Sequence, residues 1–554
     1  MVTLQKKDLL SLAVLIALCG WLFFFQAGKL ALTDPDETFY AQTAKEMLAK
    51  GEWVTPHLYG RPQFEKPIFF YWLIEISYKV FGVNEFAARF PSAVAGLIGV
   101  IVIYLLGTLL FGERAGFLSA VVLASNVEYI ILSRACVTDM VLTVFLLLAI
   151  LFFFYGQTAG KKLFYILSSV ALALATLTKG PVAVVIFGGA LIIYFVINRD
   201  LKGLFRMPLL QMAIVFIVVM APWYWAIYKL HGQAFVDGFF GFHNVTRFLE
   251  AEHKIGSQVY YNIPIMFGGF FPWSIFLPVG FWWAIKKISG RQSPLTGGKN
   301  GLVFALIWFV LIFGFFTASS TKLPTYIFPC FISLALIIGV LFDNFLEGNL
   351  PRLIEKGVKI SYYVLATIIL LGWAGGAIYA KLDYPEMLTG VVASSLFLAF
   401  GILLSLAMFL NKKFLVAILL IPYAIVLFLY PLNMLVVPEI ERYETSKEVA
   451  YKINTLMEPD EALGAESNYL AGLAFYTGKF PIDLDKHHIQ IQFMNSRGRV
   501  WAVMKEKNHG HLYDPEITKE YVKPSYVVYK VGKRALVTNE VPAGGYIKKR
   551  EAPR

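Results

Sequence analysis

The sequence predicts a polytopic α-helical membrane protein with about 13 transmembrane helices and a small α/β domain outside the membrane. Of its 554 residues, 58% are hydrophobic and only 16% are charged, whereas soluble domains are nearer half apolar and about a quarter charged. The apolar residues fall in runs of roughly 20, which is the length that an α-helix needs to cross the hydrocarbon layer. The residues after Pro438 contain no such run and begin with a polar segment of mixed charge.

Candidate spans occur throughout the first 437 residues. They lie near residues 9–27, 85–111, 115–133, 138–156, 162–178, 181–198, 208–228, 261–285, 301–318, 325–343, 360–380, 387–410 and 414–435. The first has no small-residue cleavage site after it, so we interpret it as an uncleaved span and not as a signal peptide.

The loop charges orient these spans. With the N-terminus in the cytoplasm, nearly every Lys/Arg cluster falls in an inside loop, as the positive-inside rule requires. These inside loops are Gly112–Arg114, Gly160–Lys162, Asn198–Arg206, Lys286–Lys299, Arg352–Lys359 and Asn411–Lys413. The net charge of +12 is therefore a topology signal, and we expect no nucleic-acid partner.

Two regions are then predicted outside the membrane. Residues 438–554 form the α/β domain, with a helix at Lys447–Met457 and strands at Val500–Met504 and Tyr526–Lys530. The loop 28–84 follows the first span. We divide the chain into a transmembrane domain at 1–437 and an extramembrane domain at 438–554. The three cysteines, Cys19, Cys136 and Cys330, lie in apolar stretches and have no metal-ligand spacing.

The loop 28–84 holds the first candidate site residues. Asp36, Glu37 and Tyr40 open a helix directly after a membrane span. Acids at a helix N-terminus interact favourably with the helix dipole, which is the structural explanation. Carboxylates placed at a membrane interface are costly and often functional, which is the alternative. Glu65 and Lys66 precede an aromatic run, where the lysine either pairs with its neighbour or holds a phosphate at the headgroup level.

Three more clusters share the outside face. Arg134 and Asp139 flank a corner between two spans, and His243, Asn244 and Arg247 lie in the loop 229–260. Lys322 and Tyr326 lie between the ninth and tenth spans. Each cluster alone is more often structural than functional. Together they predict a polar site on the outer face, with cations to stabilise a leaving phosphate and a carboxylate to orient or deprotonate an acceptor.

The motifs DPDETFYA, QFEKP, TDM at 138–140, HNVTRF and KLPTYIFPCF, in this order, resemble those of the bacterial aminoarabinose transferases that modify lipid A. These belong to glycosyltransferase family 83, which is related to the protein O-mannosyltransferases and has the GT-C fold. The resemblance covers essentially the whole chain, and it implies short amphipathic helices in the loop 28–84 and a periplasmic domain at the C-terminus. It implies a GT-C glycosyltransferase that uses an undecaprenyl-phosphate sugar as donor and lipid A as acceptor, acting as a monomer among membrane lipids.

The resemblance also implies roles for single residues. Catalytic roles fall on Asp36, Glu37 and Asp139, and binding of the donor phosphate falls on Lys66, Arg247 and Tyr326. The cavity would be lined by Tyr40, Arg134 and Lys322. Glu65, Asp139 and His243 match positions that can hold a divalent metal, zinc or magnesium, and whether the enzyme needs this metal stays open.

The sequence departs from the family pattern at HNVTRF. Asn244 stands where the family has histidine, and His243 precedes it. Gln63 likewise stands where a tyrosine is common. The sugar therefore stays open between aminoarabinose and a related amino or neutral sugar.

The predicted function is an inverting transfer of this sugar to a lipid A phosphate on the periplasmic face of the bacterial inner membrane, an activity linked to polymyxin resistance. Two alternatives remain. A protein O-glycosyltransferase would use the same donor with a Ser/Thr acceptor. A lipid transporter or flippase would explain the spans, but transporters usually bind near the bilayer midplane and often contain repeats.

Overall fold

A computed structural model describes residues 6–246, 258, 260–289 and 297–540. The chain divides into two compact units. Unit 1 contains residues 1–27, 64–73 and 89–432, and unit 2 contains residues 28–63, 74–88 and 433–554. The C-terminal residues thus group with most of the loop 28–84. The sequence-based boundary at 437/438 stays a prediction.

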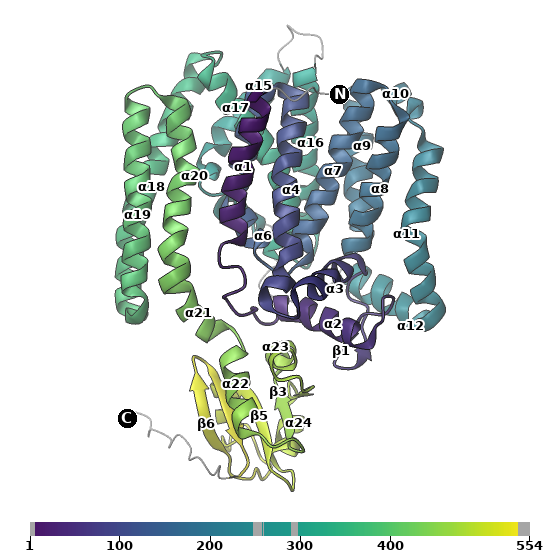
Figure 1. Cartoon of the computed structure of the whole chain (residues 1–554), viewed down its shortest axis with the longest axis vertical. Helices are drawn as coiled ribbons and strands as arrows, with labels where there is room; N and C mark the ends of the chain where they lie inside the picture. The colour runs from purple at the N-terminus through teal and green to yellow at the C-terminus, as the bar shows by residue number, and fades with distance from the viewer. Residues whose placement is uncertain (1–5, 247–257, 259, 290–296, 541–554) are drawn as a thin grey trace. The chain divides into compact units, whose positions relative to one another are not determined.

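Unit 1 is a bundle of helices (Figure 1). Its principal helices are α1 (Lys6–Phe24), α4 (Glu85–Phe111, of which residues 89–111 belong to the unit), α5 (Glu113–Ala124), α6 (Val127–Ser133), α7 (Thr138–Ala159), α8 (Lys162–Lys179), α9 (Val182–Ile197), α11 (Leu209–His231), α14 (Asn262–Gly269), α15 (Leu277–Ser289), α16 (Gly297–Ala318), α17 (Phe331–Leu346), α18 (Arg352–Asp383), α19 (Leu388–Leu410) and α20 (Phe414–Pro431). Shorter elements connect them, among them α10 (Leu201–Arg206), α12 (Gln233–Phe235), η1 (Val236–Thr246), η3 (Trp273–Phe276), η4 (Pro324–Cys330) and η5 (Pro385–Met387). The element η6 (Leu432–Val436) follows α20, and only its first residue belongs to unit 1.

The described helices confirm a polytopic membrane protein. Nine of them are long and apolar enough to cross a membrane, and two bent helix pairs pass the same test as pairs. The apolar segments Leu9–Phe24 and Val182–Ile197 are shorter. The predicted number of 13 spans stays a prediction. Close helix contacts use small residues: a Cβ atom on Gly107 of α4 would lie 2.6 Å from the Cα atom of Gly116 in α5.

Two spans predicted as continuous are bent. The span near 115–133 is α5 followed by α6, with a bend of 69°, and the span near 261–285 bends by 112° between α14 and the segment Trp273–Ser289. The first break lies at Ser125 and Asn126, whose side chains satisfy freed backbone groups. The Asn126 Oδ1 atom accepts from the N–H of Tyr129 at 2.9 Å. Ser125 Oγ accepts from Trp273 Nε1 at 3.0 Å and so joins the two breaks.

Unit 2 contains a five-stranded sheet in the order β4-β3-β5-β7-β6. Its strands are β3 (Ala462–Ala465), β4 (Ile482–Asp483), β5 (Val500–Lys505), β6 (Tyr526–Val531) and β7 (Arg534–Thr538). β3 runs parallel to β4 and β5, and β7 runs antiparallel to β5 and β6. The predicted strands at 500–504 and 526–530 are confirmed, as is the helix at 447–457, which is α22 (Lys447–Leu456).

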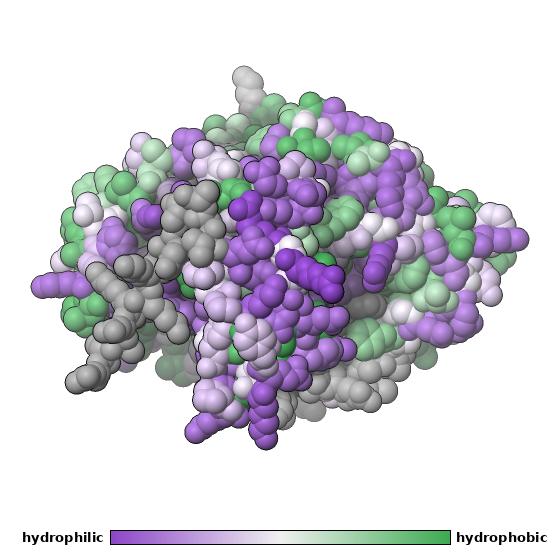
Figure 2. Space-filling view, turned by 90° about the horizontal axis from the view of Figure 1, so that it is seen from below, coloured by the Kyte–Doolittle hydropathy of each residue, from purple (hydrophilic) through white to green (hydrophobic). Residues whose placement is uncertain are grey.

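Strands β5 and β7 are buried, and the alternation of side chains along β5 sends neighbouring residues to opposite faces of the sheet. Trp501 and Val503 of β5 pack in one apolar cluster with residues of α22 and α23 (Ser467–Thr477). Ala502 and Met504 pack in a second cluster with residues of α24 (His487–Met494). Figure 2 shows one face of the molecule, on which both hydrophilic and hydrophobic residues are exposed.

The loop 28–84 contributes the other part of unit 2. It forms α2 (Asp36–Lys50), a short hairpin of β1 (His57–Leu58) and β2 (Arg61–Pro62), and α3 (Phe69–Phe81), of which residues 74–81 belong to the unit. Gly51 ends α2 in the left-handed conformation, with φ of 66°, which glycine adopts without steric cost. The remaining helices of the C-terminal part are α21 (Val437–Glu444) and α25 (Glu506–His511).

Candidate functional site

Unit 1 contains a buried charged cluster at one end of its helices. α7 and α8 pack as an antiparallel pair, which places the first turn of α7 beside the last turn of α8. Asp139 in that first turn is 7% exposed. Its Oδ1 atom lies 2.5 Å from the Nζ atom of Lys179, the last residue of α8. The same ammonium lies 4.9 Å from the ring centroid of Tyr326, in η4.

Glu128 of α6 completes this cluster. The side chain is buried, and its Oε1 atom has no hydrogen-bond partner in the described part of the chain. A Cβ atom on Gly269 would lie 2.2 Å from the Oε2 atom of Glu128, so a larger residue there would displace the Glu128 carboxyl. Asp139 lies within electrostatic reach of this carboxyl. We call Glu128, Asp139, Lys179 and Tyr326 the Asp139 cluster.

Sequence reasoning found two members of this cluster and missed two. Asp139 and Tyr326 were candidates from separate motifs, and the structure brings them together around Lys179. Lys179 lies in a loop predicted to be outside, where the positive-inside rule disfavours a lysine. Glu128 is an ionisable residue within a predicted span, which is a signal of function in its own right.

The other predicted site residues of unit 1 have more local surroundings. Arg134 donates through Nη1 to the carbonyl oxygens of Leu22 and Phe25, at 3.0 and 2.9 Å. A positive charge at this position stabilises the C-terminal end of α1. The predicted role of Arg134 in lining the cavity stays a prediction. Lys66 is partly buried, with Nζ 3.4 Å from the carbonyl oxygen of Glu65. Lys322 is 6% exposed.

The acidic motif lies in unit 2, at the start of α2. Asp36 is its first residue and is exposed, whereas Glu37 is 4% exposed. The Oε2 atom of Glu37 accepts from the N–H of Thr33 at 3.0 Å and from its hydroxyl at 2.6 Å. Glu37 thereby ties the preceding loop to the helix. Tyr40 is partly buried and packs edge-on against Phe39, with ring centroids 5.2 Å apart.

Asp34 lies two residues before Asp36 and is partly buried. Burial raises the pKa of the Asp34 carboxyl to about 7, against the hydrogen bonds from Ser446 and Thr38 and the positive charge of Arg534, which lower it. The motif therefore contains a carboxyl with an unusual environment as well as the exposed Asp36.

The predicted metal ligands do not come together in the described residues. Asp139 is paired with Lys179, and among the described residues no group of three or more His, Cys, Asp or Glu could hold a metal ion. His243 lies in η1, and its side chain, with the whole of Arg247, lies outside what the structure describes. The described residues do not fit a metal site, so no step is derived through a metal.

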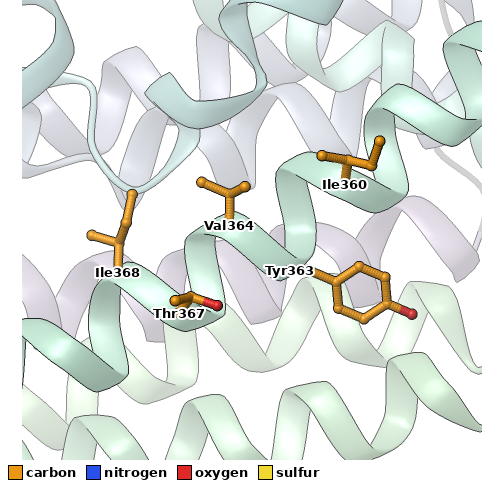
Figure 3. A pocket seen from close by; sticks show the side chains of 5 residues that line it. All are labelled: Ile360, Tyr363, Val364, Thr367 and Ile368. Carbon is orange, nitrogen blue, oxygen red and sulfur yellow. The ribbon is translucent and has the colours of Figure 1, made fainter.

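Two pockets found in unit 1 are apolar and contain none of the predicted site residues. One lies along α18 (Figure 3) and is lined by Ile360, Tyr363, Val364, Thr367 and Ile368. The other has a cavity volume of about 360 Å³ and lies among α18, α19, α20 and Phe271.

Comparisons with known proteins connect this architecture to a family. The family described as dolichyl-phosphate-mannose-protein mannosyltransferase matches residues 65–225. The undecaprenyl phosphate-alpha-4-amino-4-deoxy-L-arabinose arabinosyl transferase of Edwardsiella ictaluri is 31% identical over 388 residues, which cover 67% of this chain and 68% of that protein. The protein of the same name from Shewanella sediminis is 30% identical over 401 residues, 71% of each chain. The chain belongs to this arabinosyl transferase family.

The fold agrees with that of a solved structure. The crystal structure of ArnT from Cupriavidus metallidurans bound to undecaprenyl phosphate aligns with a TM-score of 0.79 and 22% identity, over 99% of this chain and 100% of that one. The expected GT-C fold is thereby confirmed. As a member of the arabinosyl transferase family the chain is a multi-pass membrane glycosyltransferase, which favours an enzyme over the transporter that the sequence left open.

Proposed function

We propose that this transferase moves a sugar, aminoarabinose or a related sugar, from undecaprenyl phosphate to a phosphate of lipid A on the periplasmic face of the bacterial inner membrane. The names of its relatives support an undecaprenyl-phosphate donor. The Asp139 cluster, buried at one end of the helices of unit 1, is the observation on which the proposal chiefly rests.

The position of this cluster supports the periplasmic side. Tyr326 precedes α17, whereas Asp343 and Glu347 lie at the other end of that helix and pair with Arg114. Lys287 bonds to Asn344 at the same end. Two of the loops predicted to be cytoplasmic, those that contain Arg114 and Lys287, therefore lie at the end of α17 opposite to the Asp139 cluster. By the positive-inside rule that basic end faces the cytoplasm.

The proposed reaction is a single inverting displacement. An oxygen of the acceptor phosphate forms a bond to the anomeric carbon, and the bond from that carbon to the oxygen of undecaprenyl phosphate breaks. The electron pair leaves on the undecaprenyl phosphate, whose added negative charge Lys66, Arg247 and Tyr326 stabilise. The acceptor phosphate is already ionised, so Asp36 orients it and balances charge. Asp139, held by Lys179, shapes the site.

A labelling experiment tests this proposal. Membranes that contain the enzyme are incubated with a radiolabelled undecaprenyl-phosphate sugar, and lipid A and protein are then separated. We expect label in lipid A, and none in membranes that lack the chain. Label in neither fraction would contradict the proposed donor.

A second candidate is a protein O-glycosyltransferase with the same donor. The match of residues 65–225 to the protein mannosyltransferase family favours it. In that reaction the acceptor is a Ser or Thr hydroxyl, and Asp36 would act as the general base that removes its proton. The same labelling experiment separates the two candidates, because the label would then appear in protein and be absent from lipid A.

A further inference from the structure

The loop before α2 and the C-terminal part of the chain form one compact unit although they are far apart in sequence. Ser446 is completely buried, and its hydroxyl donates to the Oδ2 atom of Asp34. The hydroxyl of Thr38 donates to the other oxygen, Oδ1, at 3.0 Å. Both oxygens of this carboxylate are thus held, one of them by a residue 412 positions away.

Gly472 in α23 makes this contact sterically possible. A Cβ atom at that position would lie 2.1 Å from Asp34 Oδ1, well inside van der Waals contact. The buried Arg534 carries a positive charge that acts on Asp34, and it donates to the carbonyl oxygens of Thr445 and Tyr443. The guanidinium therefore holds the backbone that presents Ser446. Gly472, Ser446 and Arg534 thus form one binding pocket for the Asp34 carboxylate, which we call the Asp34 receptor.

Further contacts hold the segments on either side of Asp34. The backbone N–H of Leu32 donates to the hydroxyl of Tyr476 at 2.8 Å. Lys45 donates to the carbonyl oxygen of Phe475 at 2.6 Å, and Lys447 pairs with Glu85 at 2.7 Å. The chain on both sides of Asp36 is thereby attached to α23 and to the start of α22.

We propose that the C-terminal domain positions the catalytic carboxylate, and that Asp34, received by Ser446 and Gly472, is the positioning residue that fixes Asp36. This inference rests on the proposed function, in which Asp36 orients the acceptor. Asp34 acts through the two peptide units that separate it from Asp36 and through the first turn of α2, which the Glu37–Thr33 bonds close. The C-terminal domain thus holds the segment that carries Asp36.

The test uses purified full-length enzyme and an undecaprenyl-phosphate sugar as donor. Ser446→Ala removes the hydrogen bond, and Gly472→Ala displaces the carboxylate. Gly510→Ala is the matched control, since Gly510 is also a helical glycine of the C-terminal domain but has open space at its Cβ position. For each variant, kcat, the donor KM and the melting temperature are measured.

The expected result separates kcat from KM. Misplacement of a reacting group by about 1 Å costs on the order of 100-fold in rate, so kcat per folded molecule falls by about that factor in Ser446→Ala and Gly472→Ala. The donor KM stays unchanged, because the donor phosphate is held by residues of unit 1. Asp34→Asn keeps an acceptor for Ser446 and retains most of the activity, whereas Asp34→Ala loses it.

Two results would overturn the positioning role. One is a kcat per folded molecule equal to that of Gly510→Ala in both variants. The other is a loss of activity that follows the loss of folded protein alone. If Gly472→Ala does not fold, Ser446→Ala and Asp34→Asn decide the question, because neither adds volume to the buried contact. The proposed function itself fails separately, if the wild-type enzyme transfers no sugar from the donor.

Discussion

The buried pair of Asp139 and Lys179 allows a quantitative prediction. Replacing Lys179 by methionine keeps the length of the side chain and removes its charge, which leaves the Asp139 carboxylate buried without its partner. The side chains are 13% and 9% exposed for Lys179 and Asp139, respectively. A carboxylate in such surroundings has little access to water, so its loss of a partner is not compensated by hydration.

The magnitude follows from the geometry. At 2.5 Å and an effective dielectric constant of about 20, the attraction between unit charges is about 7 kcal/mol. Desolvation of both ions offsets much of this, but removal of one partner from a buried pair typically costs about 3–5 kcal/mol. We expect Lys179→Met to lower the free energy of unfolding by that amount. The double variant Lys179→Met/Asp139→Asn should recover most of it.

Lys359 and Glu355 provide the matched control. They pair at the same distance of 2.5 Å, but their side chains are 39% and 40% exposed. An exposed pair of this spacing contributes about 0.5 kcal/mol or less, so Lys359→Met should change stability little. The free energy is measured by reversible denaturation in detergent micelles. The reasoning is refuted if Lys179→Met costs no more than Lys359→Met, or if the two substitutions at the Asp139 pair are simply additive.

Three further predictions concern donor binding, helix capping and pH. The single variants Tyr326→Phe and Lys66→Ala should each raise the donor KM, measured in a transfer assay. Tyr326→Phe keeps the ring beside Lys179, so its melting temperature should stay unchanged. Donor KM values equal to that of the wild type in both variants would remove these residues from the phosphate site. Arg134→Met loses two hydrogen bonds to carbonyl oxygens at the end of α1 and should reduce the free energy of unfolding by about 2 kcal/mol. A change near zero would show that Arg134 does not stabilise this helix end. Burial raises the pKa of Asp34 from 3.8 to about 7 in the folded protein. Between these pH values the folded state binds more protons than the unfolded state, so stability should fall as the pH rises from about 4 to 7. Thermal melts of Asp34→Asn should lack this part of the pH dependence, and profiles identical to those of the wild type would contradict the burial of that carboxyl.

The membrane architecture could be predicted because its signals are local. A run of apolar residues long enough to span the bilayer is read directly from the sequence, and so is the charge of the loops that flank it. The breaks at Ser125 and Asn126 could not be predicted in the same way. Their polar side chains are compatible with a straight helix, and the partner that joins the two breaks, Trp273, comes from a distant span.

The candidate site was predicted in part, for a physical reason. Asp36, Asp139 and Tyr326 stand out because polar residues at membrane ends are costly and therefore informative. Lys179 gained its significance only from the packing of α7 against α8, which brings it to Asp139. The receptor for Asp34 depends on Ser446, which lies 412 positions away. No local pattern contains that information.

The most direct test of the account compares lipid A and membrane proteins by mass spectrometry. The samples come from cells with the wild-type chain, with the Asp36→Ala variant and without the chain. The account predicts a lipid A phosphate that carries one added sugar in the wild-type cells alone, with the variant present in the membrane in equal amount. Sugar on lipid A in the Asp36→Ala cells, or sugar on membrane proteins in place of lipid A, would contradict it.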